Sequence, residues 1–282
     1  MDLNNKLCVI TGANSGIGKA VAMRLAEGGA FVMMICRNEE KARSAREEIV
    51  SKTGNNGVEV IIADLQLQYD VRKAAEELKS RFDQIDLLIN NAGIYPSDRQ
   101  ETPDGIERTL AINYLGHFML TYLLADHLEA SDQARVINVT SDTHRMAAPW
   151  FDLKNLMLEE GFTPFRAYAQ SKLCNIMFAR ELETRTSGRL KSYAVHPGVV
   201  KTNLPSESGW LLKLSYFLGG PFMRSPEGGA EPIIYLSKSE EAAGQSGAYF
   251  KRKRRSKPAE VVLDEDKRRG LWERSKRLCN LE

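Results

Sequence analysis

Two side chains that could act together on one small molecule lie close together in the stretch AYAQSKLCNIMFARELE. Tyr168 and Lys172 are four residues apart, so on a helix they project from the same face, one turn apart. The ammonium group would favour the ionised phenol and lower its pKa from a usual value of about 10. Tyr168 would then give and take a proton near neutral pH. An isolated pair of this kind is more often a packed tyrosine beside a solvated lysine, so its meaning depends on the surrounding elements.

The pair lies in one of several helical segments that alternate with short apolar strands. The predicted strands are 7–11, 31–36, 58–63, 86–90, 135–140 and 191–196, with a shorter seventh at 247–250. The predicted helices are 16–29, 38–52, 69–82, 104–129 and 168–186. This alternation, with strands apolar on both faces, predicts an α/β Rossmann fold, a doubly wound parallel sheet with helices on both sides. With no internal repeat or low-complexity linker, residues 1–282 are expected to form a single domain.

Composition and charge exclude several classes of protein. Hydrophobic residues make up 43% and charged residues 27% of the 282 residues, as in ordinary soluble proteins. The net charge of only +2 provides no overall field for nucleic acid, so no nucleic-acid partner is expected. Four scattered cysteines predict neither a metal site nor a disulfide framework. No signal peptide and no apolar run of about 20 residues is visible, so we expect a cytoplasmic protein without a transmembrane segment.

A glycine-rich turn follows the first predicted strand. The stretch TGANSGIG places Gly12, Gly16 and Gly18 where the strand turns into a helix. Glycines there allow a tight turn and let backbone N–H groups approach a pyrophosphate at the positive end of the helix. The spacing is GxxxGxG and not the common GxGxxG, and an isolated turn of this kind is often structural. Its place at the start of a Rossmann pattern favours a dinucleotide site.

The end of the second predicted strand indicates which dinucleotide binds. A site for NAD would place Asp or Glu there to bind the ribose 2′-hydroxyl, but the residue is Cys36. Arg37 follows, and a guanidinium group is suited to the 2′-phosphate of NADP. A solvated arginine is the alternative. The missing acid favours NADP(H).

Motifs spread along nearly the whole chain resemble the short-chain dehydrogenase/reductase family. They are TGANSGIG, NNAG at 90–93, Asn113, Ser141, YAQSK and HPG at 196–198, in this order. The stretches CRNEEKA, LAINYLGHFMLT, SKLCNIMFARELE and YAVHPGVVKTNL are most similar to the retinol dehydrogenase branch. The resemblance implies an enzyme that interconverts a carbonyl and its alcohol with NADP(H). A cofactor-binding regulator without turnover is the alternative.

The resemblance also implies roles for individual residues. The catalytic set would be Asn113, Ser141, Tyr168 and Lys172. Tyr168 would exchange the proton, Ser141 would donate a hydrogen bond to the same substrate oxygen, and Asn113 would help to hold a water that connects Lys172 to solvent. From the residues alone, a helix cap for Ser141 and a structural hydrogen bond for Asn113 stay open.

The remaining residues implied by the resemblance would surround the cofactor. They are Gly12, Asn14, Ser15, Gly16, Ile17, Gly18, Arg37, Asp64, Leu65, Asn91, Ala92, Gly93, Tyr168, Lys172, Pro197, Gly198, Val199 and Thr202. Asp64 would contact the adenine, with a helix cap as its alternative, and Thr202 would reach the nicotinamide carboxamide. His196 is assigned no proton-transfer role.

Two apolar segments flank the predicted site. Residues 142–167 and a region at about 203–226 carry Trp, Phe, Leu and Met, which predicts a pocket wall and a mobile lid for a bulky lipophilic substrate. Satellite cores are one alternative, and a membrane contact by 210–223 is another. The basic run at 251–257 is expected to be solvated surface. The sequence leaves open the substrate, the physiological direction and the oligomeric state, a homo-oligomer included.

Overall fold

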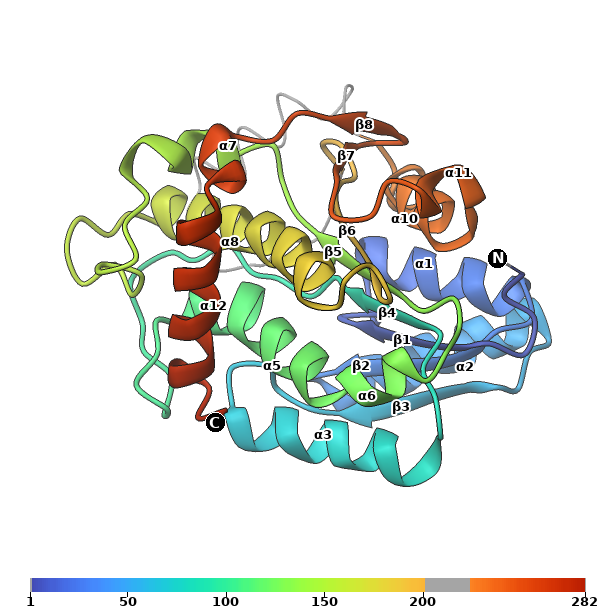
Figure 1. Cartoon of the computed structure of the whole chain (residues 1–282). Helices are drawn as coiled ribbons and strands as arrows, with labels where there is room; N and C mark the ends of the chain where they lie inside the picture. Colours follow the sequence, from blue (N-terminus) through green and yellow to red (C-terminus); the bar gives the residue numbers. More distant parts are fainter. Residues whose placement is uncertain (1, 201–223, 282) are drawn as a thin grey trace.

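The computed structural model describes residues 2–200 and 224–281, and these residues form one eight-stranded sheet (Figure 1). The strands are β1 (Leu7–Thr11), β2 (Phe31–Cys36), β3 (Val58–Ile62), β4 (Leu87–Asn90), β5 (Arg135–Val139), β6 (Lys191–His196), β7 (Tyr249–Lys251) and β8 (Arg254–Ser256). Their order is β3-β2-β1-β4-β5-β6-β7-β8. All neighbours pair in parallel except β7 and β8, which are antiparallel. The predicted doubly wound parallel sheet is confirmed.

Helices cover both faces of the sheet and enclose two hydrophobic cores (Figure 1). One face carries α1 (Gly16–Glu27), α2 (Glu39–Thr53), α10 (Pro226–Lys238) and α11 (Glu240–Ala243). The other carries α3 (Gln68–Arg81), α5 (Gly116–Leu123), α6 (Ala125–Glu129), α8 (Pro164–Arg185) and α12 (Glu265–Leu278). Successive residues of β1 face opposite layers, because Leu7 and Val9 belong to one core and Cys8 and Ile10 to the other. Burial on both faces explains the uninterrupted apolar strands.

The prediction of one continuous helix over 104–129 is wrong. The chain instead forms α4 (Arg108–Leu110), a π-helical turn η1 (Ala111–Leu115), α5 and α6. Glu107 caps the start, since its carboxylate accepts the N–H groups of Thr109 at 2.8 Å and Leu110 at 2.7 Å. The π-helical turn contains Asn113, and such turns recur at functional sites.

Two further segments differ from the sequence-based expectation. β8 lies within the basic run 251–257, and these residues lack the apolar pattern that predicts a strand. Between Ser141 and α8 lie α7 (His144–Ala147) and the 3₁₀ turn η2 (Ala148–Trp150), and a second 3₁₀ turn, η4 (Glu260–Leu263), precedes α12. Phe151, Leu156 and Met157 are buried in the main core. This part of 142–167 is therefore core and not pocket wall.

The predicted lid lies outside the described residues except for its last three positions, 224–226. Of these, Ser225 caps α10 by accepting the N–H of Gly228 at 3.2 Å. No helix within 2–200 and 224–281 is long and apolar enough to cross a membrane.

Three histidines of the described chain are buried, and burial lowers their pKa values. The pKa of His117 falls to about 3, mainly through burial and then through the nearby Lys172 charge. Burial lowers the pKa of His196 to about 4 and also lowers that of His144. Because an unfolded histidine has a pKa of about 6.5, the unfolded chain binds more protons than the folded chain below that pH.

We therefore expect the free energy of unfolding to fall between pH 7 and pH 5 by about 2 kcal/mol for each of His117 and His196. Carboxylates with lowered pKa values, such as Asp142 at about 2, lose their contribution mainly below pH 5. Urea unfolding of wild type and His117→Asn at both pH values tests this expectation. The variant should lose about 2 kcal/mol less than wild type, and an equal loss in the two proteins would contradict the assignment.

Candidate functional site

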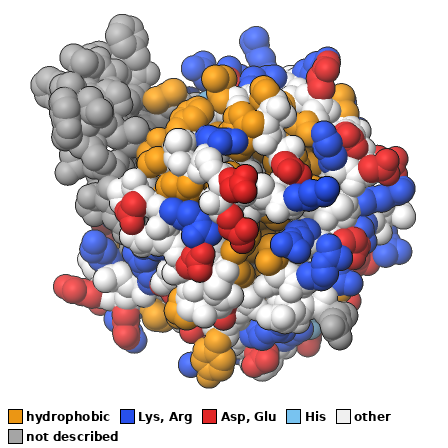
Figure 2. All heavy atoms as spheres, turned by 90° about the vertical axis from the view of Figure 1, so that its left-hand side faces the viewer, with side chains coloured by type: hydrophobic (Ala, Val, Ile, Leu, Met, Phe, Trp, Pro, Cys, Tyr) orange, Lys and Arg blue, Asp and Glu red, His pale blue; other side chains and the backbone are white. Residues whose placement is uncertain are grey.

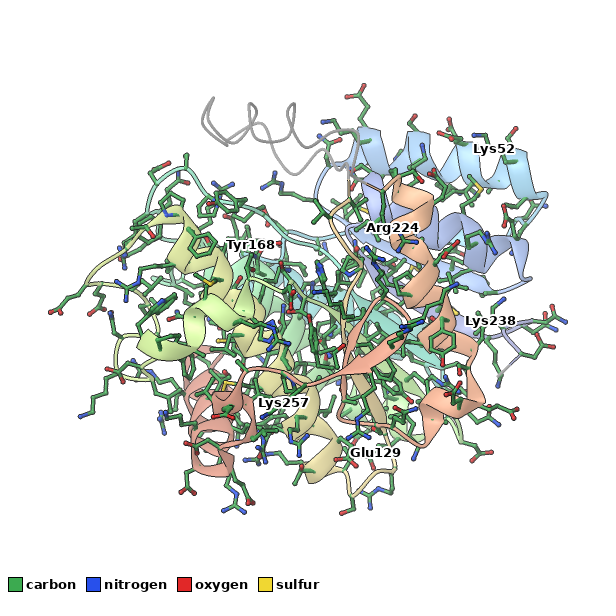
Figure 3. All side chains as sticks on the ribbon, turned by 90° about the horizontal axis from the view of Figure 1, so that it is seen from above. Lys52, Glu129, Tyr168, Arg224, Lys238 and Lys257 are labelled. Atoms are coloured by element: carbon green, nitrogen blue, oxygen red, sulfur yellow. The ribbon has the colours of Figure 1, made fainter. Side chains whose placement is uncertain are left out.

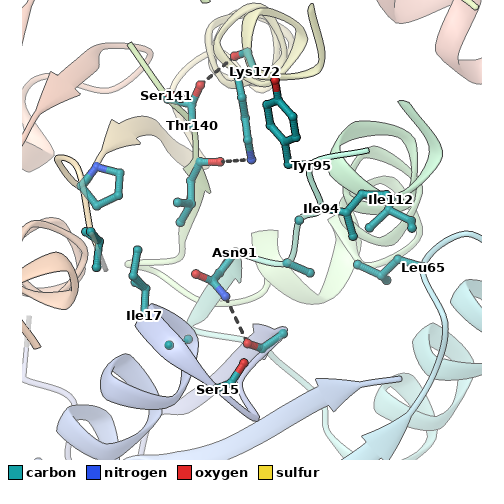
Figure 4. A pocket seen from close by; sticks show the side chains of 18 of the residues that line it. Ser15, Ile17, Leu65, Asn91, Ile94, Tyr95, Ile112, Thr140, Ser141 and Lys172 are labelled. Carbon is teal, nitrogen blue, oxygen red and sulfur yellow. Dashed lines mark hydrogen bonds between the residues drawn. The ribbon is translucent and has the colours of Figure 1, made fainter. Parts of the chain in front are cut away.

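A pocket of about 770 Å³ opens at the carboxyl ends of the parallel strands. This volume is typical of ligand sites, and the carboxyl edge is where open α/β sheets bind ligands. Seen from above, Tyr168 and Arg224 lie on this side of the molecule, and Glu129 lies on the opposite side (Figure 3). Figure 4 shows Lys172 and Ser141 at one end of the pocket, Ser15 at the other and Asn91 between them.

Most of the predicted site residues meet in this pocket. Those that line it are Gly12, Asn14, Ser15, Gly16, Ile17, Gly18, Arg37, Asp64, Leu65, Asn91, Ala92, Gly93, Ser141, Tyr168, Lys172, Pro197, Gly198 and Val199. Thr202 lies outside the described residues. Asn113 is fully buried behind the wall and is not among the lining residues of the described chain.

The turn between β1 and α1 forms a cradle for an anion. Gly12 has φ +67°, and a Cβ on it would lie 2.9 Å from the Cα of Ala92. A Cβ on Gly18 would lie 2.2 Å from the carbonyl oxygen of Gly12. Ser15 is the N-cap residue of α1, but its side chain makes no capping hydrogen bond within the described part of the chain. The first turn of α1 contains no acidic residue. The first N–H groups and the positive end of the helix therefore face the pocket without an internal counter-charge.

A cationic corner follows β2. Arg37 is 55% exposed at its side chain, and its Nη1 lies 3.9 Å from Oδ2 of Asp64. Lys41, on the first turn of α2, lines the same corner although the sequence pattern did not single it out. Its place in the first turn of the helix that directly follows Arg37 is the signal that could have identified it. Asp64 is no helix cap, because α3 begins at Gln68 with Leu67 at the N-cap.

The NNAG segment after β4 divides its roles between structure and pocket. Asn90 is buried, and its amide donates to Thr121 Oγ1 at 3.1 Å and to Asn138 Oδ1 at 2.9 Å. Asn91 instead donates from its side chain to the Thr11 carbonyl at 2.9 Å, which ties the segment to the end of β1. This agrees with a structural Asn90 and with Asn91 at the border of the pocket.

Tyr168 and Lys172 face the same space from α8. Lys172 Nζ lies 5.6 Å from the centre of the Tyr168 ring and donates to the carbonyl of Val139, the last residue of β5, at 3.2 Å. Burial lowers the pKa of Lys172 to about 8. α8 begins at Pro164, because Thr163 caps it by accepting the Arg166 N–H at 3.1 Å.

Ser141 reaches the pocket from the loop after β5. Its Oγ accepts the N–H of Thr143 at 3.3 Å within a local turn, and the N-cap of α7 is Thr143 and not Ser141. The hydroxyl hydrogen of Ser141 is therefore available to a ligand in the pocket.

An apolar wall completes the pocket beyond the polar groups. Its members are Ile94, Tyr95, Ile112 and Phe165, and the Tyr95 and Tyr168 ring centres are 5.3 Å apart. Apart from Phe165, these residues lie outside the segments expected to form the wall. Tyr95 follows the NNAG segment within the same loop, and Ile112 lies in the π-helical turn.

Comparison with known proteins agrees with this geometry. A family model described as short chain dehydrogenase matches residues 6–153. Human retinol dehydrogenase 13 is 38% identical over 285 residues, which cover 98% of this chain and 85% of that protein. The crystal structure of an uncharacterized protein from Mycobacterium paratuberculosis has a TM-score of 0.80 at 30% identity and covers 100% of this chain and 97% of that one. A dehydrogenase-like structure from Escherichia coli CFT073 complexed with NADPH has a TM-score of 0.70 at 24% identity, with 90% and 99% covered.

Together, the sheet order, the pocket geometry and these matches show that the chain belongs to the short-chain dehydrogenase/reductase family and is an oxidoreductase with a retinol dehydrogenase among its relatives.

Proposed function

We propose that the protein uses NADP(H) to reduce a carbonyl group, or to oxidise the corresponding alcohol, of a bulky apolar substrate, with Tyr168 as proton donor and acceptor. One observation carries the proposal. The anion cradle, the cationic corner and the Ser141, Tyr168 and Lys172 group all line the same pocket of about 770 Å³.

The residues present fit a dinucleotide that carries a 2′-phosphate. The glycine turn and the start of α1 suit the pyrophosphate, and Arg37 and Lys41 suit the extra phosphate. Cys36 stands where a carboxylate would bind a ribose 2′-hydroxyl. When bound, the nicotinamide would supply a hydride to the carbonyl carbon or accept one from the carbinol carbon. The complex of the Escherichia coli neighbour with NADPH supports this choice.

The side chains at the other end of the pocket suit the proton-transfer half of the reaction. In reduction, the Tyr168 hydroxyl would deliver its proton to the substrate oxygen as that oxygen gains negative charge. Ser141 would hold the same oxygen by a hydrogen bond. Lys172, anchored to the Val139 carbonyl, would place a positive charge beneath the tyrosine ring. In oxidation, the same proton would return to Tyr168.

The apolar wall supports a bulky lipophilic substrate. Ile94, Tyr95, Ile112 and Phe165 give the pocket its apolar surface, and Phe165 is 39% exposed. Hydrophobic side chains also gather among the charged ones on the molecular face shown in Figure 2. The name of human retinol dehydrogenase 13 points to an apolar alcohol as the substrate of that relative. A retinoid or a similar extended apolar alcohol is therefore a reasonable first substrate to assay.

A panel of aldehydes and ketones graded by size and polarity tests the proposed function. With NADPH oxidation as the readout, kcat/KM should rise with the apolar size of the carbonyl compound, because the wall buries apolar surface. Tight NADPH binding without oxidation by any member of the panel would favour a cofactor-binding regulator. A preference for small polar carbonyl compounds would reject the assigned substrate class.

Replacing Tyr168 with Phe removes the proton donor but keeps the aromatic ring. We expect kcat to fall by about 100-fold or more, with the Kd for NADPH within about threefold of wild type. The matched control is Tyr235→Phe, which removes a hydroxyl bonded to Glu241 on α11, and its kcat should not change. Stopped-flow rates and fluorescence titration give the two quantities. Wild-type rates in Tyr168→Phe would disprove the assignment.

Replacing Arg37 or Lys41 with Ala tests the cationic corner. Each variant should weaken NADPH binding by about 10-fold or more, since charge-assisted hydrogen bonds contribute about 1.5–3 kcal/mol. NADH binding should change little, because NADH lacks the phosphate. Arg43→Ala is the control, because it removes an exposed cation of α2 that pairs with Glu39. Equal losses for NADPH and NADH would remove these residues from the phosphate site.

A further inference from the structure

The main-chain carbonyl of Asn113 accepts two hydrogen bonds from side chains of the protein. Nδ1 of His117 lies 3.2 Å from this oxygen, and Nδ2 of Asn175 on α8 lies 3.0 Å from it. A carbonyl oxygen has two lone pairs, so both acceptor positions are taken. The bond to a carbonyl also shows that Nδ1 of His117 carries its hydrogen.

The other ring nitrogen of His117 extends the network to the end of β1. Nε2 lies 2.9 Å from Thr11 Oγ1, and because Nδ1 holds the hydrogen, Nε2 accepts from the threonine hydroxyl. Thr11 Oγ1 in turn accepts the N–H groups of Asn91 at 2.9 Å and Ala92 at 3.0 Å. A continuous chain of hydrogen bonds therefore joins the NNAG segment, through Thr11 and His117, to the backbone of Asn113.

The side chain of Asn113 joins the same segment to the catalytic helix. Its Oδ1 accepts the Ile94 N–H at 2.7 Å, and its Nδ2 donates to the Ile94 carbonyl at 2.9 Å and to Ser171 Oγ at 3.1 Å. Ser171 donates to the carbonyl of Tyr168 at 2.8 Å. The three network residues Asn113, His117 and Asn175 are buried, with at most 1% exposed.

His117 keeps one protonation state over the range in which the enzyme would work. Burial, followed by the neighbouring charge of Lys172, lowers the pKa of His117 to about 3. The imidazole is therefore neutral near pH 7, and its two neighbours fix a single tautomer. A neutral ring donates to Asn113 and accepts from Thr11 at the same time.

We propose that His117 and Asn175 are positioning residues that fix the backbone of Asn113, and that Asn113 acts as a spacer between the loop after β4 and α8. The spacer sets where Tyr168 and Lys172 stand relative to the cofactor. The expected effect of this network on turnover rests on the proposed function.

Three replacements of His117 separate its two hydrogen bonds. An Asn side chain places its amide near the position of Nδ1 and can keep the bond to Asn113, whereas a Gln side chain reaches the position of Nε2, and Leu keeps neither bond. We expect kcat with NADPH and the best carbonyl substrate to fall about 10- to 100-fold in His117→Gln and His117→Leu. His117→Asn should stay within about fivefold of wild type. The Kd for NADPH should change less than kcat in all three.

Thr121→Val is the matched control. The Thr121 hydroxyl donates to the backbone carbonyl of His117 at 2.7 Å on the same buried helix and accepts from the structural Asn90 amide at 3.1 Å, and neither of these two bonds involves Asn113. Thr121→Val should lower the Tm about as much as His117→Leu does, while its kcat stays within about threefold of the wild-type value. If Thr121→Val lost as much kcat as His117→Leu at an equal loss of stability, general destabilisation would explain both and the proposal would fail.

Amide hydrogen exchange tests the network without turnover. The Ile94 N–H, bound to Asn113 Oδ1, and the Gly116 N–H, bound to the Ala111 carbonyl, report on the loop and the π-helical turn. Both should exchange about 10-fold faster in His117→Leu than in His117→Asn, with α2 unchanged. If the two variants differ in exchange in this way but the wild-type protein reduces no carbonyl compound, the proposed function is rejected and the spacer is retained. Equal exchange in both variants would reject the spacer, whatever the activity.

Discussion

Asn113 is the point at which the two halves of the site are held together. A buried carboxamide and its backbone carbonyl must find hydrogen-bond partners within the protein, because an unmet buried polar group costs about 1–3 kcal/mol. Here the partners come from the loop after β4, from α5 and from α8. Satisfying one residue therefore fixes the loop that borders the cofactor and the helix that carries Tyr168. The π-helical turn around Asn113 is the local distortion that accompanies these contacts.

Burial also sets the electrostatics of the site. The Lys172 amine loses its solvent, and burial brings its pKa to about 8. The same positive charge helps to keep His117 neutral, so the hydrogen-bond chain behind the pocket keeps its direction. At the far end, the start of α1, Arg37 and Lys41 supply positive potential on the surface of the pocket. The cavity thus combines cations toward solvent with a buried amine beside the proton donor, as phosphate binding and proton transfer require.

Much of this arrangement could be predicted from the sequence because it depends on local signals. Strands buried on both faces appear as uninterrupted apolar runs, and β1, β2 and β6 match the predicted ranges 7–11, 31–36 and 191–196. The glycine turn, Arg37 and the Tyr168 and Lys172 pair also depend on spacing within one element or turn. Their gathering in one pocket follows from the parallel topology, in which the carboxyl ends share an edge.

Features set by distant contacts could not be predicted. The π-helical turn within the expected helix over 104–129 accompanies bonds from Asn113 to Ile94, which is 19 residues away. The core position of Phe151 depends on packing between elements, and β8 has the composition of a solvated charged loop. The hydrogen bonds of His117 and Asn175 to Asn113 could not be predicted either, because the sequence of an apolar helix does not indicate which group an isolated polar side chain will contact.

The most direct test of the account follows the hydride itself. The protein would be incubated with an apolar aldehyde and NADPH that carries deuterium at the transferable position of nicotinamide C4. Mass spectrometry of the alcohol product should then find one deuterium atom per molecule, bound to the carbinol carbon. An alcohol formed without deuterium at that carbon would contradict direct transfer from the cofactor. The absence of any alcohol product, with NADPH bound and the aldehyde in excess, would also contradict the account.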